Sequence, residues 1–122
     1  MPSAYDPLMA RARDLAILES VASLVGYDER TSMPSRAANW RAEQNSYLAR
    51  LLHERATDPQ IGLLLNEATD DVKSQPADSE QRANVREMQR EYDRAVKLPG
   101  DFVAEMSRTT SLAEHAWAEA RK

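Results

Sequence analysis

Residues 79–122 read SEQRANVREMQREYDRAVKLPGDFVAEMSRTTSLAEHAWAEARK, and apolar side chains recur in them at intervals of three and four. This spacing places side chains on one side of an α-helix. The first set is Val85, Met88, Tyr92, Ala95 and Val96. The second set is Phe102, Met106, Thr109, Ala113, Trp117 and Ala120. Because Leu98-Pro99-Gly100 separates them, we predict two helices joined by a short turn into an antiparallel hairpin, over which the remaining helices pack.

The composition also favours an all-α fold. Charged residues make up 30% and aromatic residues 6% of the 122 residues, and there are three glycines. This balance suits packed amphipathic helices better than a β-sheet. A chain of this length forms one domain and buries roughly two thirds of its unfolded surface. We therefore predict a single domain over residues 1–122, an all-α bundle of about five helices.

The charge balance and the missing residue types exclude several classes of protein. Sixteen Lys and Arg against twenty Asp and Glu give a net charge of −4, which is unlike a general nucleic-acid binder. The absence of cysteine excludes disulfides and thiolate metal sites. The first residues, MPSAYDPLMARARD, lack the apolar run of a signal peptide, and no run reaches the ~18 apolar residues of a membrane span. We expect a cytoplasmic protein without nucleic-acid or membrane partners.

Local signals mark the ends of the first helix. Asp6-Pro7 predicts its start, because Asp caps helices and Pro fits the first helical position. Gly26 predicts its end. Residues 26–35 (GYDERTSMPS) predict an irregular segment, since Pro34 disfavours helical backbone at Met33. The positions expected to face inward are Leu8, Ala12, Leu15, Ala16, Leu18, Ala22 and Val25.

Three further helices are expected before the last one. The second runs from near Ser35 to about Ala56, and Asp58-Pro59 repeats the start signal for a short third helix. After a polar link, Asp78 with Gln81 three residues later resembles a capping box that begins the fourth. The inward positions of the second helix are Ala37, Trp40, Tyr47, Leu48, Leu51 and Leu52. Those of the third are Ile61, Leu64, Leu65 and Ala68.

Four blocks of the sequence carry a resemblance to a known family. They are YDERTSMP at 27–34, RAEQ at 41–44, LLHERATDPQIGLLL at 51–65 and the run at 82–121 that contains Tyr92-Asp93-Arg94, Leu98-Pro99 and Trp117. In order and spacing they resemble the N-terminal region of the carboxypeptidase Taq family, the thermostable zinc metallocarboxypeptidases. That family usually has a segment like Trp-Asp-Gln-Glu-Thr-x-Met-Pro at the first block, so Tyr27 replaces Trp and Glu29 replaces Gln.

The resemblance implies an all-α fold, a metal-dependent exopeptidase that removes C-terminal residues from peptides, and frequent homodimers. It also implies that the family's zinc site, an H-E-x-x-H motif with a further glutamate, lies outside this region in a much longer chain. We therefore expect no catalytic, cofactor-binding or metal-ligating residue here. Zinc or another divalent metal would be bound elsewhere in the family's proteins.

The two histidines are the first candidates for metal ligands. His53-Glu54 begins a zincin-like pattern, but Thr57 stands where the second His belongs. We interpret His53 as an ordinary residue at a helix end. His115 and Glu119 lie one helical turn apart, but a catalytic zinc needs three protein ligands and an open position. We interpret this pair as interacting exposed residues.

Charged residues at regular intervals form a second group of candidates. Four arginines of the fourth helix recur every four residues, namely Arg82, Arg86, Arg90 and Arg94. One interpretation of this row is docking to an acidic partner or to the rest of an enzyme. We favour a solvated helix surface, on which the pairs Glu87–Arg90 and Glu91–Arg94 relieve the repulsion between the arginines. Asp28 with Glu29, and Asp70 with Asp71, lack the pattern of a calcium loop and are interpreted as turn and cap residues.

Three hypotheses for function follow. The first is the non-catalytic N-terminal helical region of a carboxypeptidase Taq-like protein, a scaffold and a wall of the substrate groove. The alternative is a free-standing helical protein-binding or dimerisation module. The sequence is helix-forming up to Lys122, which fits a native terminus and a longer chain equally well. We disfavour a peptidase in its own right, because its ligands cannot be assembled.

Both favoured hypotheses predict a protein partner or self-association, with a homodimer possible. Trp40 and Trp117 are expected to be core or interface anchors. The candidate interface residues are Tyr27, Asp28, Met33, Trp40, Arg86, Arg90 and Trp117.

Overall fold

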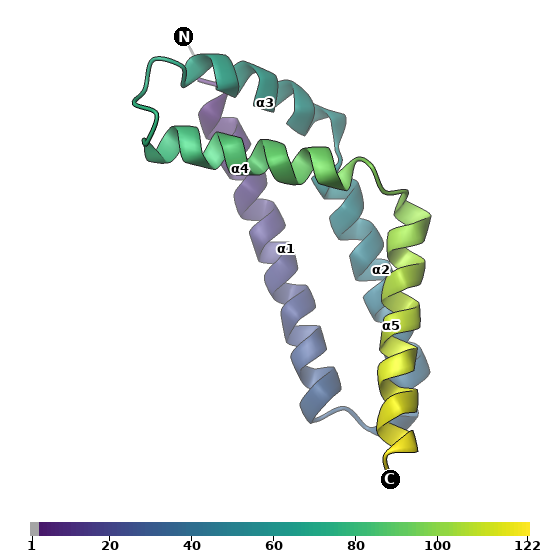
Figure 1. Ribbon diagram of the computed structural model, residues 1–122. Coiled ribbons are helices and arrows are strands. Elements are labelled where there is room, and N and C mark those ends of the chain that lie inside the picture. The colour runs from purple at the N-terminus through teal and green to yellow at the C-terminus, as the bar shows by residue number, and fades with distance from the viewer. Residues whose placement is uncertain (1–2) are drawn as a thin grey trace. The chain divides into compact units, whose positions relative to one another are not determined.

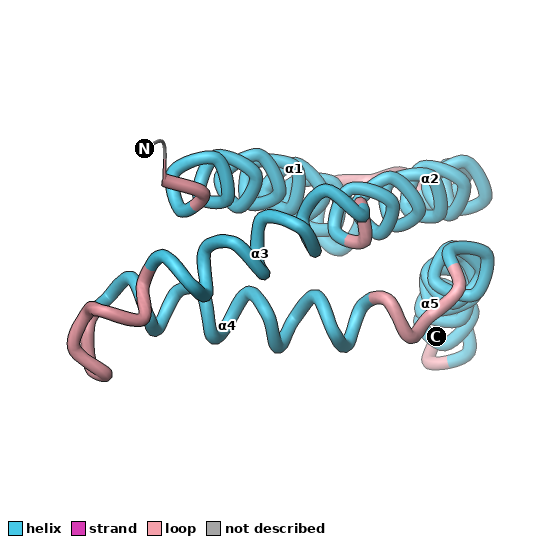
Figure 2. Tube along the Cα trace, turned by 90° about the horizontal axis from the view of Figure 1, so that it is seen from above, coloured by secondary structure: helices cyan, strands magenta, loops and turns pink. Residues whose placement is uncertain are grey.

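The computed structural model describes residues 3–122, and every regular element in that range is a helix. The five α-helices are α1 (Tyr5–Thr31), α2 (Ala38–Ala56), α3 (Pro59–Asp71), α4 (Glu80–Ala95) and α5 (Gly100–Ala120), and one turn of 3₁₀ helix covers Ser35–Ala37 (Figures 1 and 2). The all-α fold is confirmed. None of these helices is long and apolar enough to cross a membrane, as far as residues 3–122 show.

The described chain divides into two compact units. Unit 1 contains the residues up to Ala16 together with Arg55–Leu98, and unit 2 contains Ile17–Glu54 and Pro99–Lys122. The first half of α1 therefore belongs to unit 1 and its second half to unit 2. The single domain over residues 1–122 stays a prediction, and Met1 and Pro2 lie outside the described residues.

Unit 1 has a hydrophobic core, and α3 and α4 lie side by side in it (Figure 2). Leu8 of α1 and Leu65 of α3 are fully buried at its centre. The inward positions predicted for α3 are confirmed, with Leu64 only half-buried. Val85 of α4 is buried, and Val96, which follows the end of α4, is 47% exposed. The buried core residues are Ala4, Leu8, Ile61, Leu65, Ala68, Val72 and Val85.

The predicted start of α3 is confirmed, and that of α4 is wrong by one residue. Asp58 caps α3, since its Oδ1 accepts a hydrogen bond from the Gln60 N–H at 2.9 Å. That bond, with the neighbouring Arg11 guanidinium, lowers the pKa of Asp58. α4 is capped by Ser79, whose Oγ accepts from the Arg82 N–H at 3.3 Å. Asp78 therefore precedes the capping position.

Both predicted ends of α1 are corrected. The helix begins at Tyr5, so Asp6 lies within its first turn, and Ser3 Oγ accepts from the Tyr5 N–H at 3.1 Å. At the other end it continues through Gly26 to Thr31. A glycine within a helix costs only about 1 kcal/mol, and side chains beyond Gly26 bind neighbouring helices of unit 2. Most of the segment predicted to be irregular is therefore helical.

The antiparallel hairpin of residues 79–122 is not confirmed, because α4 packs in unit 1 and α5 belongs to unit 2. The stripe predicted to face inward on α5 is exposed along its whole length, from Phe102 to Ala120. Ala104 and Ser111 are buried instead. On α2, Trp40 and Tyr47 are likewise exposed, while Leu48, Leu51 and Leu52 are half-buried. Hydrophobic periodicity grouped these apolar residues, but within residues 3–122 the whole stripe of α5 and the two aromatic residues of α2 are exposed.

A substitution in the core tests the packing of unit 1. Leu65→Ala should lower the free energy of unfolding by about 2–5 kcal/mol, because a buried leucine leaves a cavity when truncated. Leu63→Ala removes the same atoms from a side chain of α3 that is 57% exposed, and should change it by less than about 1 kcal/mol. Urea denaturation followed by circular dichroism measures both. Equal losses would contradict this assignment of the core.

Candidate functional site

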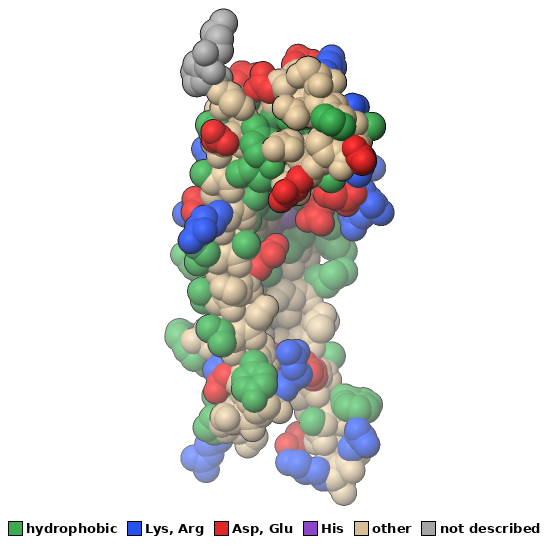
Figure 3. Space-filling model, turned by 90° about the vertical axis from the view of Figure 1, so that its left-hand side faces the viewer, with side chains coloured by type: hydrophobic (Ala, Val, Ile, Leu, Met, Phe, Trp, Pro, Cys, Tyr) green, Lys and Arg blue, Asp and Glu red, His purple; other side chains and the backbone are tan. Residues whose placement is uncertain are grey.

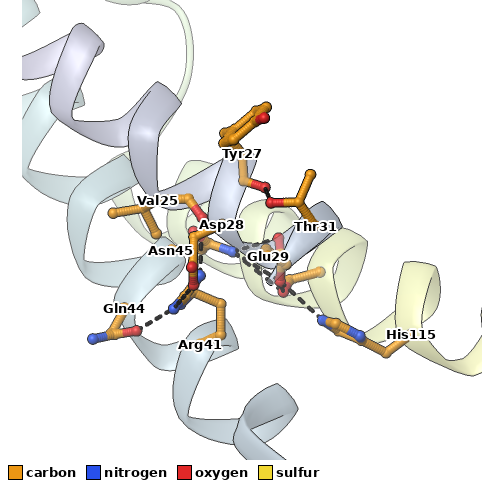
Figure 4. Close-up of polar contacts among 10 residues, drawn as sticks. Val25, Tyr27, Asp28, Glu29, Thr31, Arg41, Gln44, Asn45 and His115 are labelled. Carbon is orange, nitrogen blue, oxygen red and sulfur yellow. Dashed lines mark hydrogen bonds and ion pairs between the residues drawn. The ribbon is translucent and has the colours of Figure 1, made fainter. Parts of the chain in front are cut away.

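A buried carboxylate in the last turns of α1 connects three helices of unit 2 (Figure 4). The Glu29 side chain is only 6% exposed. Its Oε2 accepts hydrogen bonds from Ser111 Oγ at 2.5 Å and from His115 Nε2 at 3.0 Å, both on α5. Asn45 of α2 donates from Nδ2 to Oε1 at 3.2 Å. We call Glu29, Asn45, Ser111 and His115 the Glu29 cluster.

The electrostatics of the Glu29 cluster favour the ionised carboxylate. Burial alone raises the pKa of Glu29, because it removes the charge from water. The hydrogen bonds from Ser111, His115 and Asn45, together with the charge interaction with His115, outweigh burial and hold the pKa below its usual value. Glu29 is therefore a carboxylate anion with hydrogen-bond donors in place around it.

A second polar contact lies beside the cluster and also joins α1 to α2. Arg41 Nη2 pairs with Asp28 Oδ2 at 2.7 Å, and Arg41 Nη1 donates to the Val25 carbonyl at 2.9 Å (Figure 4). The Arg41 side chain is 15% exposed. Asp28 and Glu29 therefore act neither as turn nor as cap residues, which corrects their interpretation. Asp71 does act as a cap, because its Oδ2 accepts from the Ala4 N–H next to the start of α1.

The geometry of the Glu29 cluster does not suit nucleophilic catalysis. In a serine triad the imidazole accepts the proton of the serine hydroxyl, and the carboxylate holds the other side of the ring. Here Ser111 and His115 both donate to the same carboxylate oxygen. The Ser111 hydroxyl therefore donates to the Glu29 carboxylate, and the His115 imidazole does not accept its proton.

The residues of this chain do not fit a catalytic zinc either. Within residues 3–122, no three His, Cys, Asp or Glu side chains gather closely enough to hold a metal ion, whereas a catalytic zinc needs three protein ligands. His53 lies in the last turn of α2, as expected. His115 bonds to Glu29 rather than to Glu119, which accepts instead from Lys122 Nζ at 2.8 Å.

Five of the candidate interface residues lie in unit 2. Tyr27 is 66%, Trp40 69% and Trp117 61% exposed. The Arg121 guanidinium lies 4.5 Å from the centre of the Trp117 ring. Asp28 is paired with Arg41 as described, and Met33 is half-buried after the end of α1. The two tryptophans are therefore not core residues, and they remain candidates for an interface.

The arginines of α4 lie in unit 1. Arg86 and Arg90 are exposed, and Arg90 Nη1 lies 3.6 Å from Glu87 Oε2, which confirms one of the two predicted pairs. Arg82 is half-buried and donates to the Gln75 carbonyl at 3.3 Å. This arrangement agrees with the solvated helix surface that we favoured.

Unit 2 also carries a hollow with apolar walls. It has a volume of about 740 Å³ and is lined by Val21 and Val25 of α1 and by Trp40, Tyr47 and Leu48 of α2. Arg108 of α5 borders it and pairs with Glu43. Ile17 and Leu24 of α1 are exposed as well, and Figure 3 shows hydrophobic side chains at the surface on the side that α1 occupies.

The sequence contains only weak signals for the polar contacts of unit 2 that the sequence analysis did not predict. Ser111 and His115, like Arg41 and Asn45, are spaced by four residues, so each pair lies on one side of its helix. Polar residues at such spacing are common on exposed helix surfaces, so the pattern alone does not select them. Their common partners, Asp28 and Glu29, were predicted to lie in an irregular segment.

The Glu29 cluster yields a stability prediction with a pH dependence. Glu29→Gln should lower the free energy of unfolding at neutral pH by about 1–3 kcal/mol, because the amide brings a donor among donors in a buried place. The folded pKa of Glu29 is lowered, so the wild-type advantage is complete above its ordinary pKa and disappears as the pH falls through the folded value. Urea denaturation at several pH values measures the difference.

The control for this experiment is Glu19→Gln, which makes the same change at an exposed position of α1. It should alter the stability by less than about 0.5 kcal/mol at any pH. If the two variants were equally stable at neutral pH, Glu29 would not hold unit 2 together.

Comparison with known proteins agrees with the resemblance seen in the sequence. The family model of carboxypeptidase Taq (M32) metallopeptidases matches residues 7–122. The chain is 39% identical to thermostable carboxypeptidase 1 of Thermus thermophilus over 119 residues, which are 98% of this chain and 23% of that protein. It is 29% identical to thermostable carboxypeptidase 1 of Pyrococcus furiosus over 114 residues, 93% of this chain and 22% of that protein.

The chain thus spans less than a quarter of the length of these two relatives. No solved structure gives a significant match. The family model, in contrast, covers nearly all of the residues that form the two units. This chain belongs to the carboxypeptidase Taq (M32) metallopeptidase family.

Proposed function

We propose that this chain is the non-catalytic N-terminal helical region of a carboxypeptidase Taq-like metallopeptidase. It acts as a scaffold and as one wall of the peptide-binding groove, and the metal centre is supplied by other parts of the protein. The observation that carries this proposal is the extent of the match. The family model covers residues 7–122, yet the aligned residues make up only 22–23% of the two relatives.

The chemistry of the donor set supports a non-catalytic role. The 122 residues contain two histidines and no cysteine, and His115 already bonds to a buried carboxylate. A metallopeptidase needs three protein ligands and an open position for water or substrate. Residues outside this chain would have to provide them.

The packing supports the roles of scaffold and wall. Unit 1 has a core around Leu8 and Leu65, and the Glu29 cluster fixes three helices of unit 2 to one another. The hollow beside Trp40 and Tyr47 is mostly apolar with a few charged groups at its edge, as is common where ligands bind to proteins. A homodimer and a cytoplasmic location remain part of the proposal.

A chimaera tests the proposal directly. The aligned segment of the Thermus thermostable carboxypeptidase 1 is replaced by this chain, and release of the C-terminal residue from an N-blocked dipeptide is measured with zinc or cobalt supplied. The chimaera should keep activity within about tenfold of the parent, a loss of no more than about 1.4 kcal/mol in transition-state stabilisation. This chain alone should release nothing.

Two results would count against the proposal. Peptidase activity of this chain alone, lost in His115→Ala, would show a catalytic site in the chain itself. A chimaera that folds but is inactive, together with a stable dimer of the isolated chain, would favour the alternative of a free-standing dimerisation module.

A further inference from the structure

α5 buries its small side chains and exposes its large apolar ones. Phe102, Met106 and Trp117 are 47%, 55% and 61% exposed. Ala113, about three helical turns after Phe102, lies on the same side and is exposed. We call Phe102, Met106, Ala113 and Trp117 the outer side of α5. A surface helix normally turns such a stripe towards a core.

The opposite side of α5 is the one that packs. Ser111 follows Phe102 by about two and a half turns, which places it across the helix. Ser111 is 3% and Ala104 2% exposed, and Ser111 belongs to the Glu29 cluster. The rotation of α5 is thus fixed by a buried hydrogen bond, so the helix cannot turn its outer side inward without breaking the cluster.

Unit 2 offers no alternative cover for the outer side. Apart from the Glu29 carboxylate, its buried residues in the described chain are all small, namely Ala42, Ser46, Ala104 and Ser111. Small residues let helices approach closely, and the hollow of unit 2 is lined by residues of α1 and α2 and by Arg108, not by the outer side of α5. The outer side is an exposed stripe from residue 102 to residue 117, about 22 Å long at 1.5 Å per residue, and the Arg121 guanidinium lies over Trp117 at its end.

We propose that the outer side of α5 is the docking surface for the remaining polypeptide of the metallopeptidase, the part that carries the metal centre. This inference rests on the proposed function. The aligned residues make up 23% of the Thermus relative, so more than three quarters of such a protein lies outside this chain and has to pack somewhere. The outer side of α5 is an exposed apolar stripe on the last described helix, where it is available to that polypeptide.

A second copy of this chain is a weaker occupant for the same surface. Stable interfaces between separate proteins bury about 1,200–2,000 Å², and one stripe on one helix supplies only a small part of that area. A covalently joined polypeptide loses less translational and rotational freedom on docking, so a smaller surface is enough to hold it.

Thiol labelling tests the proposal without requiring activity. Because the chain has no cysteine, Met106→Cys places a single thiol on the outer side of α5. Its reaction with a maleimide is measured in the isolated chain and in the chimaera, by mass spectrometry of the peptide that contains it. Docking should slow labelling at position 106 at least about tenfold in the chimaera, as expected for a site that reacts only when the protein opens locally.

Lys73→Cys is the matched control, because the Lys73 side chain is 70% exposed and lies outside α5. It should react equally fast in both proteins. Fast labelling at position 106 in the chimaera would overturn the inference, whether or not the chimaera is active. Protection at that position in the isolated chain that grows with protein concentration would also overturn it, and would assign the surface to a second copy.

A charge substitution separates docking from a structural role within the chain. Met106→Glu should lower the thermal midpoint of the chimaera and leave that of the isolated chain unchanged, because Met106 is exposed there. An equal fall in both would mean that Met106 supports α5 itself, which contradicts the inference. Activity of the chimaera decides the proposed function, and labelling decides the docking surface, so the two can fail separately.

Discussion

The Glu29 carboxylate is the point at which α1, α2 and α5 meet. A charge withdrawn from water needs hydrogen-bond donors to compensate for lost hydration, and Ser111, His115 and Asn45 provide them. Such bonds are directional, so each helix is held at one rotation about its own axis. In unit 2, this contact, together with the Arg41–Asp28 and Arg108–Glu43 pairs, sets the directions in which the side chains of α1, α2 and α5 point. The large apolar side chains of α5 point outward because Ser111 must point towards Glu29.

The two units are stabilised in different ways. Unit 1 buries leucine, isoleucine and valine side chains, and its stability comes mainly from the hydrophobic effect. Unit 2 buries alanine and serine around a charged group, and most of the large hydrophobic side chains that are exposed in residues 3–122 belong to it. Unit 1 therefore resembles a complete small domain, whereas unit 2 resembles one layer of a larger protein. This agrees with a chain that aligns with less than a quarter of its relatives.

Local signals in the sequence predicted what depends on neighbouring residues. Asp58-Pro59 fixed the start of α3, and the spacing of Ile61, Leu65 and Ala68 identified its buried side. The continuation of α1 past Gly26 was missed because its support comes from Asn45, Ser111 and His115, which lie 16, 82 and 86 residues from Glu29. Periodicity showed that Phe102, Met106 and Trp117 share a side of α5. It could not show the direction in which this side faces, because direction is set by packing partners.

The proposed docking would place the two sides of α5 under different selection. Replacing Ala104 or Ser111 by a larger residue would separate helices within this chain, so these positions are restricted by the chain itself. Phe102, Met106 and Trp117 would be restricted mainly by the polypeptide that we propose to cover them. In a gene copy that had lost the peptidase portion, the small residues would persist while the aromatic ones drifted towards polar types. The relative rates of change on the two sides would therefore record, in any lineage, whether the two portions are still inherited together.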